Sequence, residues 1–280
     1  MPDNNYLSFS GGSKILSGVY SIYDHQRAEN KHIAGHHVTM TEIYRDLYGA
    51  ELIDQLKVEH LLYHFYAIIN AFDDLIDESP DETKHAVIAN SIRIFNSFFE
   101  IIRSILPADR VNQMKNVFSF VPQIIEAPAR ENDLISTSKT ENIAETLADL
   151  LMIRCQNHVL AIKLVDSLII TETFDLETAI TCLKAMEILL KDLNSDEMQI
   201  DKQQGSVNVV LYLRDRLKLK NAVILDELRK TKQILEEKIV NSSNELPERF
   251  RALLASFLRE TNEEFEKKAA KSNFQQEEIR

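Results

Sequence analysis

Apolar residues recur every three or four positions through most of this chain of 280 residues, and that spacing is typical of helices that bury one face. Segments of strict apolar and polar alternation between turn residues, which would indicate strands, are absent from the sequence. The pattern predicts helices over residues 38–49, 51–77, 81–105, 108–126, 140–171, 175–202, 206–241 and 246–271. Because only six glycines and six prolines are present to form turns, we expect an all-α protein.

The segments between these helices suggest how the chain is organised. Prolines, which lack an amide hydrogen, fall near several expected breaks or kinks, namely Pro107, Pro122, Pro128 and Pro247. Residues 1–35 are rich in Asn, Ser, Gly and His, and we expect them to form an irregular arm or lid. No linker or repeat divides the remainder, so the sequence predicts one all-α domain over 36–272 and a frayed tail over 273–280.

Composition narrows the function classes. The formal charge of −12, from 44 acidic and 32 basic residues, argues against a nucleic-acid binder, whose affinity would come from Lys and Arg. A phosphorylated small molecule stays open if a cationic pocket or divalent ions receive it. No basic and apolar leader or long apolar run is present, and Cys155 and Cys182 lack metal-type spacing. We therefore expect a cytoplasmic protein without a membrane span, with both cysteines in the core.

One helix end carries unusual chemistry. The segment Leu61–Phe72 (LLYHFYAIINAF) is apolar nearly all round, which predicts a helix surrounded by others. Carboxylates follow it at once: Asp73, Asp74, Asp77 and Glu78. In a last helical turn each carboxylate opposes the helix dipole at a cost of about 0.3–1 kcal/mol. A sequence selected for stability alone would place Lys or Arg there.

Magnesium ions would reverse this balance, because carboxylate oxygens are ligands that Mg²⁺ prefers. Asp73 and Asp77 lie four residues apart and share one helix face, which continues backwards through Asn70 and Tyr66. Asp74 lies to the side of that face. The alternative is an ordinary acidic helix end in solvent, but its position after a fully apolar helix favours a metal platform.

A second region carries a family resemblance. The stretch Lys191–Leu228 reads KDLNSDEMQIDKQQGSVNVVLYLRDRLKLKNAVILDEL. Together with FYAIINAFDDLIDE, it resembles the bacterial-type class I terpene synthases, whose second motif reads N-D-L-x-S-x-x-x-E. Asp192, Leu193 and Ser195 match that motif, and the later Gly205, Asn208 and LYLRDRLKLKNAV also match. Lys191 and Gln199 stand where the family has its Asn and Glu.

The resemblance implies a single-domain helical bundle with a central active-site cavity, two or three Mg²⁺ ions and a set of site residues. It implies that Asp73 and Asp77 bridge metal ions and, with Arg154, act in catalysis. The wider metal set adds Asp74, Asp192 and Ser195, with Gln199 as a weaker member. The segment LLMIRCQNHVLAIKLVDSL places Arg154 where the family reads diphosphate. Beyond the resemblance, we expect Lys191 and Lys202 to bind diphosphate as well, with the ammonium of Lys191 in place of one Mg²⁺. The cavity would be lined by Tyr66, Ile69, Asn70, Asn157 and His158.

The function that this resemblance implies is a carbon–oxygen lyase reaction. A linear prenyl diphosphate (geranyl, farnesyl or geranylgeranyl) is ionised and its carbocation cyclises. An isoprenyl diphosphate synthase or other prenyltransferase is the nearest rival, but the second D-D-x-x-D and basic G-G-K-R expected for it are missing. A catalytically impaired binding protein is the third reading, suggested by Lys191 and Gln199. The fold often pairs as a homodimer. His60 and His64 could bind zinc but lack a third ligand.

Overall fold

The structure is a computed structural model, and a defined part of the chain is described by it. The described residues are 62, 65, 92–93, 96, 99–100, 103, 121–137, 141–156, 158–161, 163, 176–204 and 207–271. Regular structure within these ranges is helical, with no strand. The expectation of an all-α protein is therefore confirmed for the described residues. No helix among them is both long and apolar enough to cross a membrane.

The chain divides into two compact units. One comprises residues 1–119 and 164–171, and the other comprises residues 120–163 and 172–280. In the first unit, Leu62 and Phe65 are helical and buried, in agreement with the surrounded helix predicted there. The second unit contains every helix whose bounds the structure defines. Whether residues 36–272 form a single domain stays a prediction.

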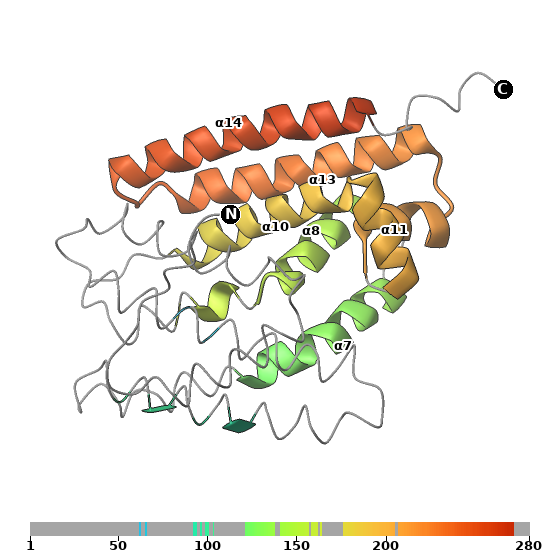
Figure 1. Ribbon diagram of the computed structural model, residues 1–280. Coiled ribbons are helices and arrows are strands. Elements are labelled where there is room, and N and C mark those ends of the chain that lie inside the picture. Colours follow the sequence, from blue (N-terminus) through green and yellow to red (C-terminus); the bar gives the residue numbers. More distant parts are fainter. Residues whose placement is uncertain are drawn as a thin grey trace, which may run out of the picture. The chain divides into compact units, whose positions relative to one another are not determined.

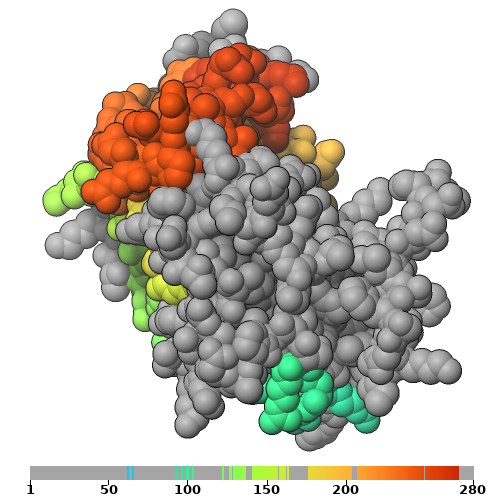
Figure 2. All heavy atoms as spheres, turned by 90° about the vertical axis from the view of Figure 1, so that its left-hand side faces the viewer, coloured from blue at the N-terminus to red at the C-terminus, as the bar shows by residue number. Residues whose placement is uncertain are grey.

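The second unit is a layered helical bundle (Figure 1). Its helices are α7 (Val121–Thr137), α8 (Ile143–Arg154), α10 (Glu177–Asp192), α11 (Ser195–Gln204), α12 (Val209–Leu211), the π-helical turn η1 (Tyr212–Arg216), α13 (Asn221–Ser242) and α14 (Glu248–Lys271). Helix α10 packs against α8, α13 and α14, and α8 packs in turn against α7. Helices α13 and α14 run antiparallel in Figure 1, and α14 reaches the surface on the face in Figure 2.

The core of this unit is centred on α10. Ile180, Met186 and Leu189 are buried there, because a helix with neighbours on several sides needs apolar residues around most of its circumference. The free thiols of Cys155 and Cys182 are also buried. The prediction that both cysteines belong to the core is confirmed.

Several predicted helix boundaries are wrong, and local bonding explains two of them. The helix predicted over 175–202 is interrupted after Asp192, where Asn194 Oδ1 accepts a hydrogen bond from the Asp196 N–H at 3.0 Å. Such a side-chain bond offers the backbone an alternative to the continuing helix. The helix predicted over 206–241 is divided by residues 217–220, where Lys218 has a φ of 56°. A left-handed residue commonly ends a helix.

The predicted helix end before Pro128 is also wrong. The helix predicted over 108–126 should stop ahead of this proline, yet α7 continues through it from Val121 to Thr137. Proline removes one helical hydrogen bond, but α7 packs against α8, and tertiary packing regularly overrides local helix propensity.

Candidate functional site

Arg154 lies at an interruption of its helix. Helix α8 ends at Arg154, and the chain turns at Cys155, whose N–H donates to the Met152 carbonyl at 3.2 Å. Helical structure resumes at once, since the N–H groups of His158 and Val159 donate to the Cys155 carbonyl at 2.9 and 3.3 Å. The guanidinium of Arg154 therefore belongs to the last turn of α8, where the helix dipole favours positive charge.

Arg154 forms a buried ion pair with Asp192. Its Nη1 donates to Asp192 Oδ2 at 2.8 Å, and 19% of the Arg154 side chain and 1% of the Asp192 side chain are exposed. Asp192 is the last residue of α10, where a carboxylate opposes the helix dipole. Besides Arg154, the N–H of Val209 stabilises it by donating to Oδ2 at 2.9 Å.

The other carboxylate oxygen of Asp192, Oδ1, has no such donor among the described residues, although it is buried. Buried polar atoms nearly always have a partner, so this oxygen is a place where a bound cation or a ligand donor would be stabilised.

Burial affects the two partners in different ways. Burial raises the pKa of Asp192, and this outweighs the lowering by Arg154 and by the amide of Val209. Burial works to lower the pKa of Arg154, but the negative charges of Asp192 and Glu131 outweigh it, so the pKa of Arg154 is raised. Arg154 therefore remains a cation, and Asp192 is the member of the pair that changes its protonation first.

Asn208 connects the segments around this pair. Its Nδ2 donates to Asp201 Oδ2 at 2.8 Å and to the Asp192 carbonyl at 3.4 Å. Its Oδ1 accepts the N–H groups of Val210 and Leu211 at 3.0 and 3.2 Å, which caps α12. Buried Asn208 thus joins the end of α10, helix α11 and the start of α12.

Asp201 is a member of this cluster that the sequence interpretation missed. Its side chain is 8% exposed and holds the amide of Asn208. A signal was available, because an asparagine directly before the apolar Val209, Val210 and Leu211 is typical of a helix N-cap. The acid that would support that asparagine seven residues earlier could not be identified without the fold.

The remaining predicted residues of the second motif lie at the surface. Ser195, Gln199 and Lys202 of α11 are exposed. Lys191 is 46% exposed, and its Nζ lies 3.3 Å from Glu197 Oε2. The structure therefore brings Arg154 together with Asp192, but it does not bury the three residues of α11 beside them. His158 is buried at 4% exposure.

The first acidic cluster and most of the predicted cavity fall outside the described residues. These positions are Tyr66, Ile69, Asn70, Asp73, Asp74, Asp77 and Asn157. Their roles stay predictions. Within the described ranges, no group of three or more His, Cys, Asp or Glu side chains could hold a metal ion. Of the predicted metal set, the described residues include Asp192, whose Oδ1 accepts no hydrogen bond from them, and Ser195 and Gln199, which are exposed.

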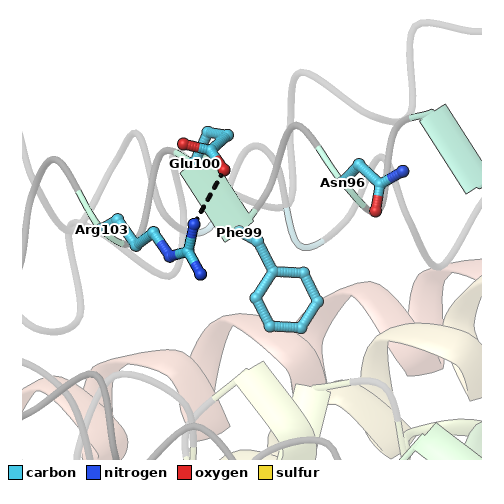
Figure 3. Close-up of a pocket in the computed structure, with 4 residues that line it drawn as sticks. All are labelled: Asn96, Phe99, Glu100 and Arg103. Carbon is cyan, nitrogen blue, oxygen red and sulfur yellow. Dashed lines mark hydrogen bonds and ion pairs between the residues drawn. The ribbon is translucent and has the colours of Figure 1, made fainter.

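A surface pocket occurs in the first unit. Asn96, Phe99, Glu100 and Arg103 line it (Figure 3). Arg103 Nη1 lies 3.1 Å from Glu100 Oε1, and both side chains are largely exposed, so their charges offset one another in solvent. None of the predicted site residues that the structure describes is among these four.

The chain matches no protein-family model, no curated protein and no solved structure. Its function must therefore be argued from the residues themselves and from the resemblance of their motifs.

Proposed function

We propose that this protein is a class I terpene synthase that ionises a linear prenyl diphosphate and cyclises the resulting carbocation. The observation that supports the proposal best is the 2.8 Å bond between Arg154 and Asp192, two residues 38 positions apart. The resemblance assigns Arg154 to diphosphate recognition and Asp192 to the second metal motif. An enzyme of this kind needs those two segments side by side.

The helix interruption gives Arg154 a suitable setting for this role. Its guanidinium has five N–H donors in a planar fork that fits phosphate oxygens. The bond to Asp192 uses Nη1, and part of the side chain stays exposed. A diphosphate approaching from that side would share the guanidinium with Asp192 or replace Asp192 as its partner.

The rest of the proposed chemistry rests on the sequence. Asp73 and Asp77, with Asp74, would hold Mg²⁺, which as a Lewis acid would stabilise the departing diphosphate. Tyr66, Ile69 and Asn70 would line a dry cavity on the same helix. An aromatic face there can stabilise a carbocation by about 0.5–2 kcal/mol.

A catalytically impaired relative that binds a prenyl diphosphate without turnover is the second candidate. Exposed Ser195 and Gln199 favour it, because metal ligands that face solvent are poorly held. Lys191 favours it further, since its ammonium group pairs with Glu197 at the position of the family's first metal ligand. This candidate shares diphosphate binding with the first and differs from it in turnover.

Product analysis separates the candidates. The purified protein is incubated with Mg²⁺ and geranyl, farnesyl or geranylgeranyl diphosphate, with and without isopentenyl diphosphate. Cyclic or hydroxylated hydrocarbons support the proposal, and longer diphosphates support a prenyltransferase. Binding without any product supports the impaired relative. Loss of both binding and turnover in every mixture contradicts all three.

Two substitutions locate the activity. Asp73→Ala and Arg154→Gln should each abolish product formation. Arg130→Gln is a matched control, because Arg130 is a half-buried arginine that donates to Gln156 Oε1 at 3.3 Å and has no proposed role. Circular dichroism of each variant separates a loss of chemistry from a loss of folding. Equal turnover in Arg154→Gln and Arg130→Gln would remove Arg154 from the mechanism.

A further inference from the structure

Seven residues, the last three of η1 and the four that link it to α13, concentrate positive charge. The segment Arg214–Lys220 reads RDRLKLK and is called here the basic segment. Its cations occupy every second position and all are exposed: Arg214, Arg216, Lys218 and Lys220. Leu217 and Leu219 alternate with the lysines and are partly buried. This alternation directs the charged side chains outward while the leucines keep contact with the protein.

The backbone of the basic segment is held in an unusual conformation. The Leu217 N–H donates to the Tyr212 carbonyl and the Leu219 N–H donates to the Leu213 carbonyl, both at 3.1 Å. Between them, Lys218 has a φ of 56°, the left-handed region that glycine adopts more readily. This left-handed residue ends η1 and turns the chain toward α13, so the lysine side chain stands at an exposed turn.

Three of the four cations of the basic segment have no side-chain partner among the described residues; Arg214 pairs with Asp215. Within the described ranges no side chain forms an ion pair or hydrogen bond with Arg216, Lys218 or Lys220, and the same holds for Lys202 of α11. Many other described surface cations are paired, including those of the bonds Lys191–Glu197, Arg229–Glu266 and Lys267–Glu264. In the part of the chain that the structure describes, the same three cations of the basic segment and Lys202 thus have no side-chain partner, although the chain as a whole is acidic.

Asp215 is the carboxylate inside this cluster, and the direction of its pKa shift shows which positive charges lie near it. Arg214 Nε donates to Asp215 Oδ1 at 3.0 Å. This bond is the main reason that the pKa of Asp215 is lowered, and the charges of Lys202 and Lys218 contribute as well. Cations from α11 and from the basic segment therefore converge on one area of the surface.

We propose that the basic segment is a peripheral docking surface for an anionic lipid bilayer, whose headgroup phosphates bind its cations. The cations are distributed along seven residues, so a single small phosphate could contact only some of them, whereas a bilayer presents many phosphates side by side. Partly buried leucines between cations suit the boundary of headgroups and acyl chains. A nucleic acid fits less well, because Tyr212, the aromatic residue nearest in sequence, is buried and cannot stack on a base. The proposal is independent of the enzymatic function proposed above.

Vesicle flotation tests this surface with the full chain. Vesicles of phosphatidylcholine alone are compared with an equal mixture of phosphatidylcholine and phosphatidylglycerol, at low and high salt. Wild-type protein should float with the anionic vesicles at low salt and be released by high salt, because exposed charges are screened. The triple variant Arg214→Gln, Lys218→Gln, Lys220→Gln should bind at least tenfold more weakly.

The control has the same net charge but changes paired cations. The variant Arg229→Gln, Lys230→Gln, Lys267→Gln removes three exposed cations that already have acidic partners, and it should float like the wild type. Equal losses in both variants would show that net charge alone drives binding and would overturn the assignment. Wild-type protein that ignores anionic vesicles, or that binds a single-stranded oligonucleotide instead, overturns it as well.

Discussion

Two arginine–carboxylate pairs of nearly equal length behave differently in this protein. Arg154 and Asp192 are joined at 2.8 Å, and Arg229 and Glu266 at 2.7 Å. The first pair has side chains 19% and 1% exposed, and the second has 48% and 53%. The pKa of Asp192 is raised because burial dominates, whereas the pKa of Glu266 is lowered because the hydrogen bond from Arg229 dominates. The difference in burial, and not the distance between the charges, therefore decides whether the pKa of the carboxylate is raised or lowered.

The comparison also indicates why each pair is present. Arg229 and Glu266 connect α13 to α14 across solvent, where a pair stabilises by about 0.2–1 kcal/mol. A buried pair is a poor source of stability, because removing two charges from water costs as much as their attraction returns. The buried pair Arg154–Asp192 is therefore better explained by a site that needs a positioned cation.

Breaking the buried pair from one side should have the largest effect. Asp192→Ala leaves Arg154 without its counter-charge and Val209 without its acceptor, and it should reduce the free energy of unfolding by about 3–5 kcal/mol. Urea denaturation measures this loss. A cost below about 1 kcal/mol would show that the pair is solvated like the surface pair.

The double variant Arg154→Met, Asp192→Leu sharpens the same comparison. Replacing both charges by apolar side chains of similar volume should recover most of the lost stability. If it also abolishes diphosphate binding, the pair is retained for function. If stability stays as low as in Asp192→Ala, packing around Arg154 and not its charge was the cause.

The two buried cysteines show the effect of burial on a titratable group that is not part of an ion pair. Burial raises the pKa of Cys182 to about 11 and also raises the pKa of Cys155. The thiolate is the reactive form, so near pH 8 Cys182 should react with iodoacetamide about 100-fold more slowly in the folded protein than after unfolding. Because the pKa of the thiol is higher in the folded protein than in the unfolded one, the buried neutral thiol contributes stability below the unfolded pKa. That contribution is lost as pH rises through the folded pKa. Mass spectrometry of alkylated protein measures both rates, and equal rates would contradict the burial.

Replacing Asn208 should give the next largest loss of stability. Asn208→Ala removes the cap of α12 and leaves Asp201 without its amide donor, so the free energy of unfolding should fall by about 2 kcal/mol. The control is Asn194→Ala, because exposed Asn194 makes a similar bond to the N–H of Asp196. Its loss should cost about 0.5 kcal/mol. Thermal unfolding compares the two, and equal losses would mean that the burial of Asn208 adds nothing.

Asn208 also illustrates how far the sequence could lead. Helical periodicity predicted the all-α class and placed α14 within two residues of its observed ends at Glu248 and Lys271. It could not predict the break between Asp192 and Ser195, because a single Asn194 side-chain bond starts the next helix there. The resemblance assigned Arg154 and Asp192 to one site without predicting their ion pair, and the support by Asp201 depends on tertiary contacts that no periodicity encodes.

The exposed pair should give the smallest effect and the opposite response to pH. A double-mutant cycle with Arg229→Ala and Glu266→Ala should yield a coupling of about 0.2–1 kcal/mol at neutral pH, reduced by solvent screening. Glu266 has a folded pKa below its unfolded value, so the coupling is fully present above the unfolded pKa and is lost as pH falls through the folded pKa. Asp192 has the higher pKa when folded, so its own contribution weakens as pH rises through that value. Urea denaturation of the four proteins of the cycle at several pH values measures the coupling. A coupling that persists at acid pH, or that does not respond to added salt, would show that Arg229 and Glu266 are shielded from water. The contrast between the two pairs would then be lost.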